Sequence, residues 1–445
     1  MRAETNSNQP AAARISFMIG TLLTSTLVQR VLLLLLPISV VHSAVRFAWL
    51  SDQPGRSLTD FDAFYIAGHM AWRGEIADAY RSAALFQAQR SFSGGESFLP
   101  WTYPPPFNLV VALLACLPHW LAYLIFTALT LAAFLFILRR IAGETFSIVL
   151  LAIYPAILVT IGCGQNGFLT GALIGLCVLG LMQGSSAAGV PLGLMVIKPH
   201  LAVAFALHVV ATQRWGCFVL SGSTAILGCV LATIAFGAPV WTAFLGGVEE
   251  AKMFLFSGYY PLFRMISVYA ALRSIDIAPQ IAMAAQVLVA CSALGCTLIV
   301  IGRRLSTTRI LGFTALASLL ISPYAYDYDL PIYGIALALL MPDFLRSATS
   351  RQQVALMILS LVTSGLGLLT TRALDLSEEG QPLDAGLSAG FGAAIPSAAG
   401  VTLLISAVLL WKVLGQKSIR GHETVVPRTA EDSYATALTP KSRVA

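Results

Sequence analysis

Residues 106–138 read PFNLVVALLACLPHWLAYLIFTALTLAAFLFIL and contain no Asp, Glu, Lys or Arg. A helix crosses the hydrocarbon core of a bilayer with about 20 apolar residues, so this run is too long for one crossing. Pro118 divides it, because proline disrupts the interior of a helix. Either its first half is a re-entrant helix, or the run makes two crossings and the weaker apolar segment 239–256 stays outside the membrane.

The rest of the chain repeats this apolar pattern. Of its 445 residues, 57% are hydrophobic and 11% are charged, whereas a soluble globular chain carries roughly 25% charged residues. Further apolar runs lie at 28–50, 146–162, 166–183, 189–210, 215–237, 278–301, 308–322, 330–345, 353–371 and 389–414. We therefore predict an all-α polytopic membrane protein of about 11–13 transmembrane helices.

The basic residues predict its orientation. They stand between apolar runs, as in cytoplasmic loops, and not in a patch with interleaved aromatics, so the net charge of +6 does not indicate a nucleic-acid partner. Placing the arginine clusters inside predicts a cytoplasmic segment 1–27, a transmembrane domain 28–414 and a polar, disordered cytoplasmic tail 415–445. The same scheme puts the loop 51–105 outside and leaves Arg214 as an exception.

All seven cysteines fall inside or at the edge of apolar runs, and none forms a CxxC pair. Such cysteines are typically small residues that face lipid or a neighbouring helix. We therefore expect these cysteines to be neither disulfides nor metal ligands, and we expect no cofactor.

The first outer loop contains two closely spaced acids. Asp60 and Asp62 flank Phe61 directly after a transmembrane run. In an extended backbone both would point to one side, and at a helix start both would meet exposed amides. A carboxylate at the membrane surface suits a general base that deprotonates a sugar hydroxyl. The alternative interpretation is a helix cap formed by Asp60 or Thr59.

A lysine interrupts the apolar run 189–210. Lys198 is followed by Pro199 and His200, and an intramembrane cation, which costs roughly 3 kcal/mol to insert, indicates a functional site. We expect it to meet a carboxylate or a lipid-linked phosphate, with His200 beside it, unless it snorkels from a helix end. Arg264 is a second candidate for the phosphate, or an anchor for an interfacial helix.

Three further polar segments are candidates for sugar binding: WTYPPP at 101–106, GQNG at 164–167 and SPYAYDYD at 322–329. Amides and carboxylates pair with sugar hydroxyls, and aromatic rings stack on sugar faces. The alternatives are an aromatic belt with a rigid turn, a tight turn between helices and a polar helix–helix turn. The residues expected to bind substrate here are Tyr103, Gln165, Asn166, Tyr324, Asp327 and Asp329.

The motifs DFDAFYIAG, WTYPPP, GQNG, KPH and SPYAYDYD, in this order, resemble glycosyltransferase family 87. The chain is similar to the polyprenol-phosphate-mannose-dependent α-mannosyltransferases of that family. The resemblance implies a GT-C type fold in the cytoplasmic (inner) membrane, with the active site on the outer side. It also implies a polyprenyl-phosphate sugar donor, a lipid or cell-envelope glycan acceptor, and inversion by direct displacement.

Within this resemblance, the family's catalytic aspartate matches Asp60 best, with Asp62 as the fallback, and no bound metal is implied. The actinobacterial mannosyltransferases carry histidine in the turn that here contains Asp327 and Asp329, so mannose and the acceptor do not follow from the motifs. A transporter or flippase is the alternative function, in which Lys198 would pair with acids inside the membrane. The apolar runs contain almost no acid, which favours the enzyme over both a transporter and a non-catalytic scaffold.

Overall fold

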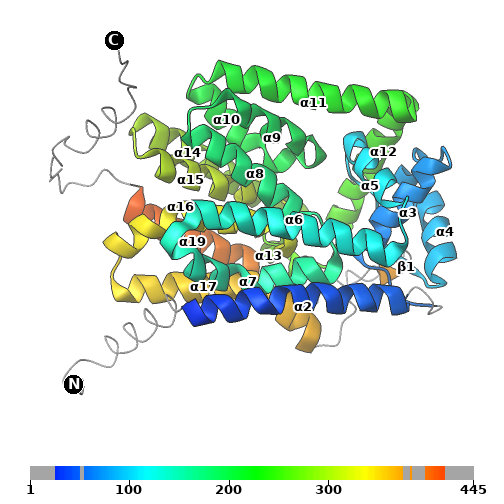
Figure 1. Cartoon of the computed structure of the whole chain (residues 1–445), viewed down its shortest axis with the longest axis horizontal. Helices are drawn as coiled ribbons and strands as arrows, with labels where there is room; N and C mark the ends of the chain where they lie inside the picture. Colours follow the sequence, from blue (N-terminus) through cyan, green and yellow to red (C-terminus); the bar gives the residue numbers. More distant parts are fainter. Residues whose placement is uncertain (1–25, 51–54, 374–380, 383–395, 416–445) are drawn as a thin grey trace, which may run out of the picture.

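The computed structural model describes residues 26–50, 55–373, 381–382 and 396–415. In this part of the chain nearly all regular structure is helical, and long helices lie side by side along the long axis of the molecule (Figure 1). The all-α membrane fold predicted from the sequence is confirmed. Most of segments 1–27 and 415–445, and most of the acidic stretch 372–388, lie outside the described residues.

The elongated bundle contains α2 (Thr26–Leu50), α6 (His119–Ala142), α7 (Phe146–Cys163), α8 (Gly167–Met182), α9 (Gly189–Leu194), α10 (Val203–Ala211), α11 (Trp215–Phe236), α14 (Pro279–Gly302), α15 (Thr307–Leu320), α16 (Pro331–Ser347), α17 (Ser350–Ala373) and α19 (Ala399–Leu414). Between these helices lie α3 (Asp60–Trp72), α4 (Ser82–Ser93), α5 (Pro105–Leu114), α12 (Pro239–Ser257) and α13 (Val268–Arg273). Short 3₁₀ turns are η1 (Asp78–Tyr80), η2 (Gly143–Thr145), η3 (Ser186–Ala188), η4 (Met195–Ile197), η5 (Pro199–Leu201), η6 (Leu262–Arg264) and η7 (Asp327–Asp329).

Among the described residues, five helical stretches are long and apolar enough to cross a membrane: Thr26–Trp49, His119–Cys163, Trp215–Phe236, Pro279–Gly302 and Ser350–Thr371. The second of them comprises α6 and α7, which η2 separates. Shorter apolar helices, among them α8, α15 and α19, complete the bundle.

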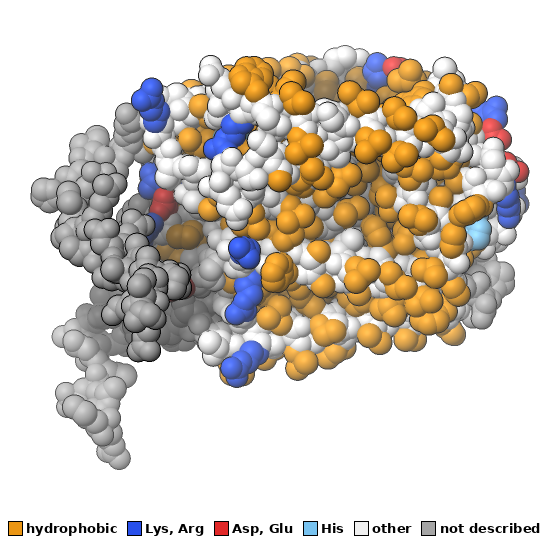
Figure 2. Space-filling model, turned by 45° about the horizontal axis from the view of Figure 1, so that its top comes forward, with side chains coloured by type: hydrophobic (Ala, Val, Ile, Leu, Met, Phe, Trp, Pro, Cys, Tyr) orange, Lys and Arg blue, Asp and Glu red, His pale blue; other side chains and the backbone are white. Residues whose placement is uncertain are grey.

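The outer surface of the bundle is apolar. Figure 2 shows hydrophobic side chains over the middle of the visible face, with Lys and Arg side chains toward its ends. On α11, Ile226 and Ile234 are 64% and 76% exposed, an arrangement that suits contact with lipid hydrocarbon and not with water.

The segment 106–138 is divided at Pro118, as its length required. Pro118 is the N-cap of α6, and α6 continues for 24 residues. The preceding α5 has only 10 residues and packs against α3, so it is too short to cross a bilayer. The chain thus makes one long helix here with a short helix before it, and 239–256 forms the separate helix α12.

Arg214 does not break the charge pattern. Its guanidinium Nη1 donates to the carbonyl of Leu181, at the C-terminal end of α8. Helices α6 and α8 run in the same direction, because Gly171 faces Phe134 and Gly175 faces Ile137 one turn later. Arg214 therefore lies at the same end of the bundle as the basic C-terminus of α6.

A two-residue ladder joins distant segments near the first loop. Strand β1 (Ser97–Phe98) pairs antiparallel with β2 (Gln381–Pro382), with Ser97 opposite Pro382. This pairing ties the loop that precedes α5 to the stretch that follows α17.

Candidate active site

Three turns between apolar helices meet around one cavity. They separate α7 from α8 at 164–166, η4 from α10 at 198–202, and α15 from α16 at 321–330. Non-helical backbone inside a membrane protein is tolerated where it is buried in protein or lines a polar cavity. The breaks in the apolar pattern therefore indicate where the polar interior lies.

The cavity has a volume of about 280 Å³. Its polar side chains come from the three turns and from the segments around α3 and α5: Asp60, Thr102, Tyr103, Gln165, Lys198, His200, Tyr324, Tyr328 and Asp329. One apolar wall is formed by Phe244, Val248 and Ala251 of α12.

Asp60 and Asp62 both lie in the first turn of α3. Residues two apart on a helix point in different directions, so the two acids have different surroundings. Thr59 is the N-cap, and the Asp62 side chain completes a capping box by accepting from the Thr59 backbone N–H at 2.7 Å. Asp62 also pairs with Arg56 at 2.7 Å and has His119 Nε2 at 2.9 Å. Asp62 does not line the cavity, whereas Asp60 does.

The same surroundings separate the ionisation of the two acids. Burial alone would raise the pKa of Asp62, but hydrogen bonds from Arg56 and His119 outweigh it and hold that pKa well below its usual range. Burial raises the pKa of the Asp60 carboxyl, and Arg264 and Gln165 offset only part of that rise. Asp62 is thus a fixed anion in a structural cluster, while Asp60 is a more basic carboxylate facing a cavity.

A short hydrogen-bond chain positions Asp60. The Tyr103 hydroxyl donates to Gln165 Oε1 at 2.7 Å, and Gln165 Nε2 donates to Asp60 Oδ1 at 3.1 Å. Because the Gln165 amide oxygen accepts the hydrogen bond from Tyr103, the NH₂ group of Gln165 faces Asp60. This NH₂ group binds Oδ1 of Asp60, so Oδ2 is the oxygen that a ligand would meet.

Two buried ion pairs anchor the turn that carries Asp327 and Asp329. Lys198 Nζ lies 2.8 Å from Asp329 Oδ1, and Arg264 binds Asp327 through Nε at 3.2 Å and Nη2 at 3.1 Å. Lys198 and Arg264 are only 6% and 5% exposed, so each cation needs its carboxylate partner. Lys198 Nζ also lies 4.7 Å from the centre of the Tyr328 ring, within the range of a cation–π contact.

Glycines allow the GQNG turn to fit against its neighbours. Gly164 ends α7 with φ +69°, a left-handed conformation that glycine adopts without strain. A Cβ on Gly167 would come within 1.7 Å of the Tyr328 carbonyl oxygen. The α8 start therefore touches the backbone of η7, which brings Gln165 and Asp329 to one cavity.

The structure brings most of the predicted substrate-binding residues to this site. Tyr103, Gln165, Lys198, His200, Tyr324 and Asp329 line the cavity together with Asp60. Arg264 and Asp327 form the ion pair described above, but neither residue lines the cavity. Asn166 is fully buried outside the lining, and its side-chain amide has no hydrogen-bond partner among the described residues.

The cavity is also lined by residues that were not predicted to be in the site: Tyr328, Thr102 and the α12 residues Phe244, Val248 and Ala251. Tyr328 lies inside the SPYAYDYD motif and was recognisable from it. The α12 residues carry no polar signal, and their part in the wall depends on how α12 folds back. Within the described ranges, no group of three His, Cys, Asp or Glu side chains is placed to hold a metal ion.

The helical bundle defines a membrane-embedded protein with a cavity lined by polar and aromatic side chains. The profile of glycosyltransferase family 87 matches residues 101–323 of the chain. The chain belongs to glycosyltransferase family 87, and it is a membrane glycosyltransferase. The matched range contains Tyr103, Gln165 and Lys198, begins after Asp60 and ends before Asp327. No curated protein and no solved structure matches the chain.

The two acids of α3 are expected to differ in their effect on stability. Asp62→Asn removes the buried carboxylate that pairs with Arg56, which should cost about 3 kcal/mol and lower the melting temperature of the purified protein. Asp60→Asn removes a carboxylate whose charged form is disfavoured by burial, so the melting temperature of this variant should stay close to that of the wild type. Equal losses in the two variants would contradict the division into a structural and a cavity-facing acid.

Proposed function

We propose that this glycosyltransferase moves a hexose, with mannose as the first candidate, from a polyprenyl-phosphate donor to a lipid or cell-envelope glycan acceptor. The observation that carries the proposal is the shared cavity of Asp60 and Lys198. It places a carboxylate of raised pKa and a buried cation around a space lined by tyrosines and an amide.

In the proposed reaction Asp60 accepts the proton of the acceptor hydroxyl. The acceptor oxygen attacks the anomeric carbon as the bond from that carbon to the phosphate oxygen breaks, and polyprenyl phosphate leaves with the electron pair. A single displacement inverts the anomeric carbon and requires one base. Lys198 stabilises the negative charge that develops on the phosphate. The Arg264–Asp327 ion pair supports the turn η7, which also carries Asp329.

Lys198 retains capacity for this role although it is paired. An ammonium group has three N–H donors, and Asp329 Oδ1 accepts one of them in the structure. The remaining donors are available to a phosphate oxygen. Tyr103, Tyr324 and Tyr328 supply ring faces and hydroxyls to the sugar, and Gln165 holds the base in place.

We also propose that the cavity faces the exterior of the cytoplasmic membrane. Arg139, Arg140 and Arg214 share one end of the bundle, and basic residues are retained on the cytoplasmic side. The loop that carries Asp60 follows α2 at the opposite end, where α6 begins (Figure 1).

Replacement of the base is expected to abolish most of the activity. Asp60→Asn keeps the shape of the side chain but cannot accept the proton, so the transfer rate should fall about 10²–10⁴-fold. The measurement is transfer from radiolabelled polyprenyl-phosphate hexoses to extracted membrane lipids, with protein reconstituted in nanodiscs. Glu75→Gln, at an exposed acid after α3, is the matched control and should retain activity. Unchanged activity of Asp60→Asn would remove Asp60 as the base.

The pH profile of transfer should report on Asp60. A base acts in its deprotonated form, so activity should fall as the pH falls through a pKa that lies above the ordinary aspartate value of 3.8. Gln165→Leu removes a hydrogen bond that favours the carboxylate, and the acidic limb of kcat/KM should therefore move to higher pH. A limb that stays in place would show that another group controls it.

The orientation is tested by cysteine labelling in intact cells. In a cysteine-free background, Glu75→Cys should react with a membrane-impermeant maleimide, whereas Glu144→Cys should react only after lysis. Both positions are exposed, and Glu144 lies in η2 at the basic end of α6. The reverse pattern would invert the orientation and leave the proposed chemistry untouched.

A further inference from the structure

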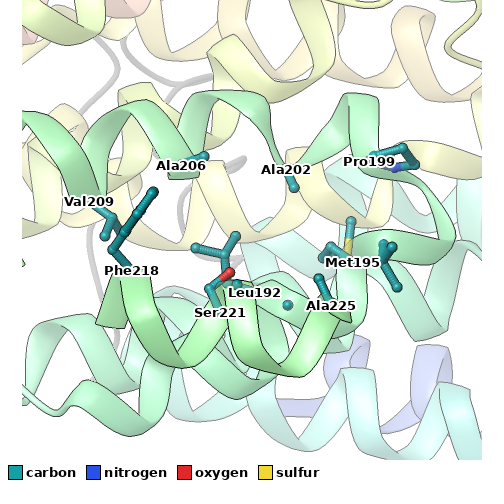
Figure 3. Close-up of a pocket in the computed structure, with 12 residues that line it drawn as sticks. Leu192, Met195, Pro199, Ala202, Ala206, Val209, Phe218, Ser221 and Ala225 are labelled. Carbon is teal, nitrogen blue, oxygen red and sulfur yellow. The ribbon is translucent and has the colours of Figure 1, made fainter. Parts of the chain in front are cut away.

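A second hollow lies beside the proposed active site, between α10 and α11. It has a volume of about 240 Å³. Figure 3 shows Ala202, Ala206 and Val209 on one side and Phe218, Ser221 and Ala225 on the other. Its lining contains no charged side chain, and Ser221 supplies its one hydroxyl. We refer to this hollow as the apolar groove.

The apolar groove has a closed floor and an exposed far end. A Cβ on Gly193 would lie 2.4 Å from the Ser221 carbonyl oxygen, so α9 packs directly on α11 beneath the groove. At the end formed by Val209 and Phe218, the Phe218 side chain is 46% exposed. Since α11 is long and apolar enough to cross the membrane, we expect this end to face lipid hydrocarbon.

The other end of the apolar groove adjoins the cavity. Pro199 lines both spaces, and Figure 3 shows it at the end of the groove away from Val209 and Phe218. Lys198, which precedes it, projects into the cavity toward Asp329. The cavity and the apolar groove therefore share a wall at Pro199, and the preceding residue, Lys198, supplies a cation for an anionic head group on the cavity side.

The geometry points to the apolar groove as the binding site for the isoprenoid tail of the lipid-phosphate donor. This inference rests on the proposed function and adds where the lipid part of the substrate lies. A phosphate held by Lys198 places the first isoprene units at Pro199, and the tail continues between α10 and α11. An isoprenoid chain makes no hydrogen bonds, which matches a lining that is apolar except for the single hydroxyl of Ser221.

The groove is long enough to direct several tail carbons. From Ala225 to Phe218 the α11 backbone rises about 10 Å. In a bilayer the tail gains nothing by leaving water, so the contribution of the groove comes from close packing and from fixing the direction of the head group. The donor is thus held with its anomeric bond in one orientation to Asp60.

Gly222 offers a direct test, because it lines the apolar groove and a Cβ there would meet no heavy atom within 4 Å. Gly222→Phe therefore fills the groove without colliding with the backbone. Gly295 of α14 also has open space at its Cβ position and lies outside the groove, so Gly295→Phe is the matched control.

For a long-tailed polyprenyl-phosphate hexose, Gly222→Phe should raise KM about fivefold, since the tail loses its packing site. A donor with a tail of one isoprene unit should be used equally well by the wild type and by Gly222→Phe, and Gly295→Phe should alter neither donor. An equal change for both donors, or no change for the long-tailed donor, would overturn the inference.

A labelling experiment separates this inference from the proposed function. A long-chain polyprenyl phosphate with a diazirine on an inner isoprene unit should label peptides within residues 192–225. Unlabelled polyprenyl phosphate should compete with it, and the uncharged polyprenol should compete much less. Labelling elsewhere, or equal competition by polyprenol, would show that the groove holds bulk lipid only. If no hexose donor supports transfer, the proposed function fails, while this labelling still decides whether the groove binds a lipid phosphate.

Discussion

The arrangement of the site depends on the requirement that a charge buried inside an apolar bundle must be paired. Asp327 and Asp329 lie two residues apart on the single turn η7, and they pair with Arg264 and Lys198 from two different segments. An isolated buried cation would be strongly unfavourable. The two pairs therefore hold η6, η7 and the Lys198 turn in one arrangement, and the cavity forms between them.

Among the described residues, Asp60 is the cavity acid that makes no ion pair, and it accepts a hydrogen bond from the neutral amide of Gln165. Lys198 and Arg264 influence its pKa from a distance, without neutralising it by direct contact. A carboxylate that is close to cations but bonded to an amide keeps its capacity to accept a proton. Asp62, by contrast, is bonded to Arg56 and to the backbone N–H of Thr59 and lies beside His119, and these contacts hold the start of α3.

Much of the fold follows from the apolar runs, because a segment with no charges has few alternatives to a buried or lipid-facing helix. The polar interruptions at Gln165, Lys198 and Asp329 predicted a shared site, since helices that span one layer place their turns at the same depth. The helix cap at Thr59 was one of the two interpretations of this segment, but the ion pair of Asp62 with Arg56 and its contact with His119 were not predictable from the local sequence. The part of α12 in the cavity wall, and the position of Arg214 beside α8, depend on contacts between distant segments that leave no local pattern.

Every charged group around the cavity is supplied by a turn or a helix start, and the helices behind them are packed through apolar side chains and small residues. Scaffold and chemistry are therefore separable in this protein. Substitutions at turn positions such as His200, Tyr324 or Tyr328 change the cavity without repacking the bundle, whereas Gly167 and the ion pairs have little freedom to vary. During evolution, such a scaffold can acquire new sugar or acceptor preferences by single replacements in its turns, and the same positions are the natural ones for engineering.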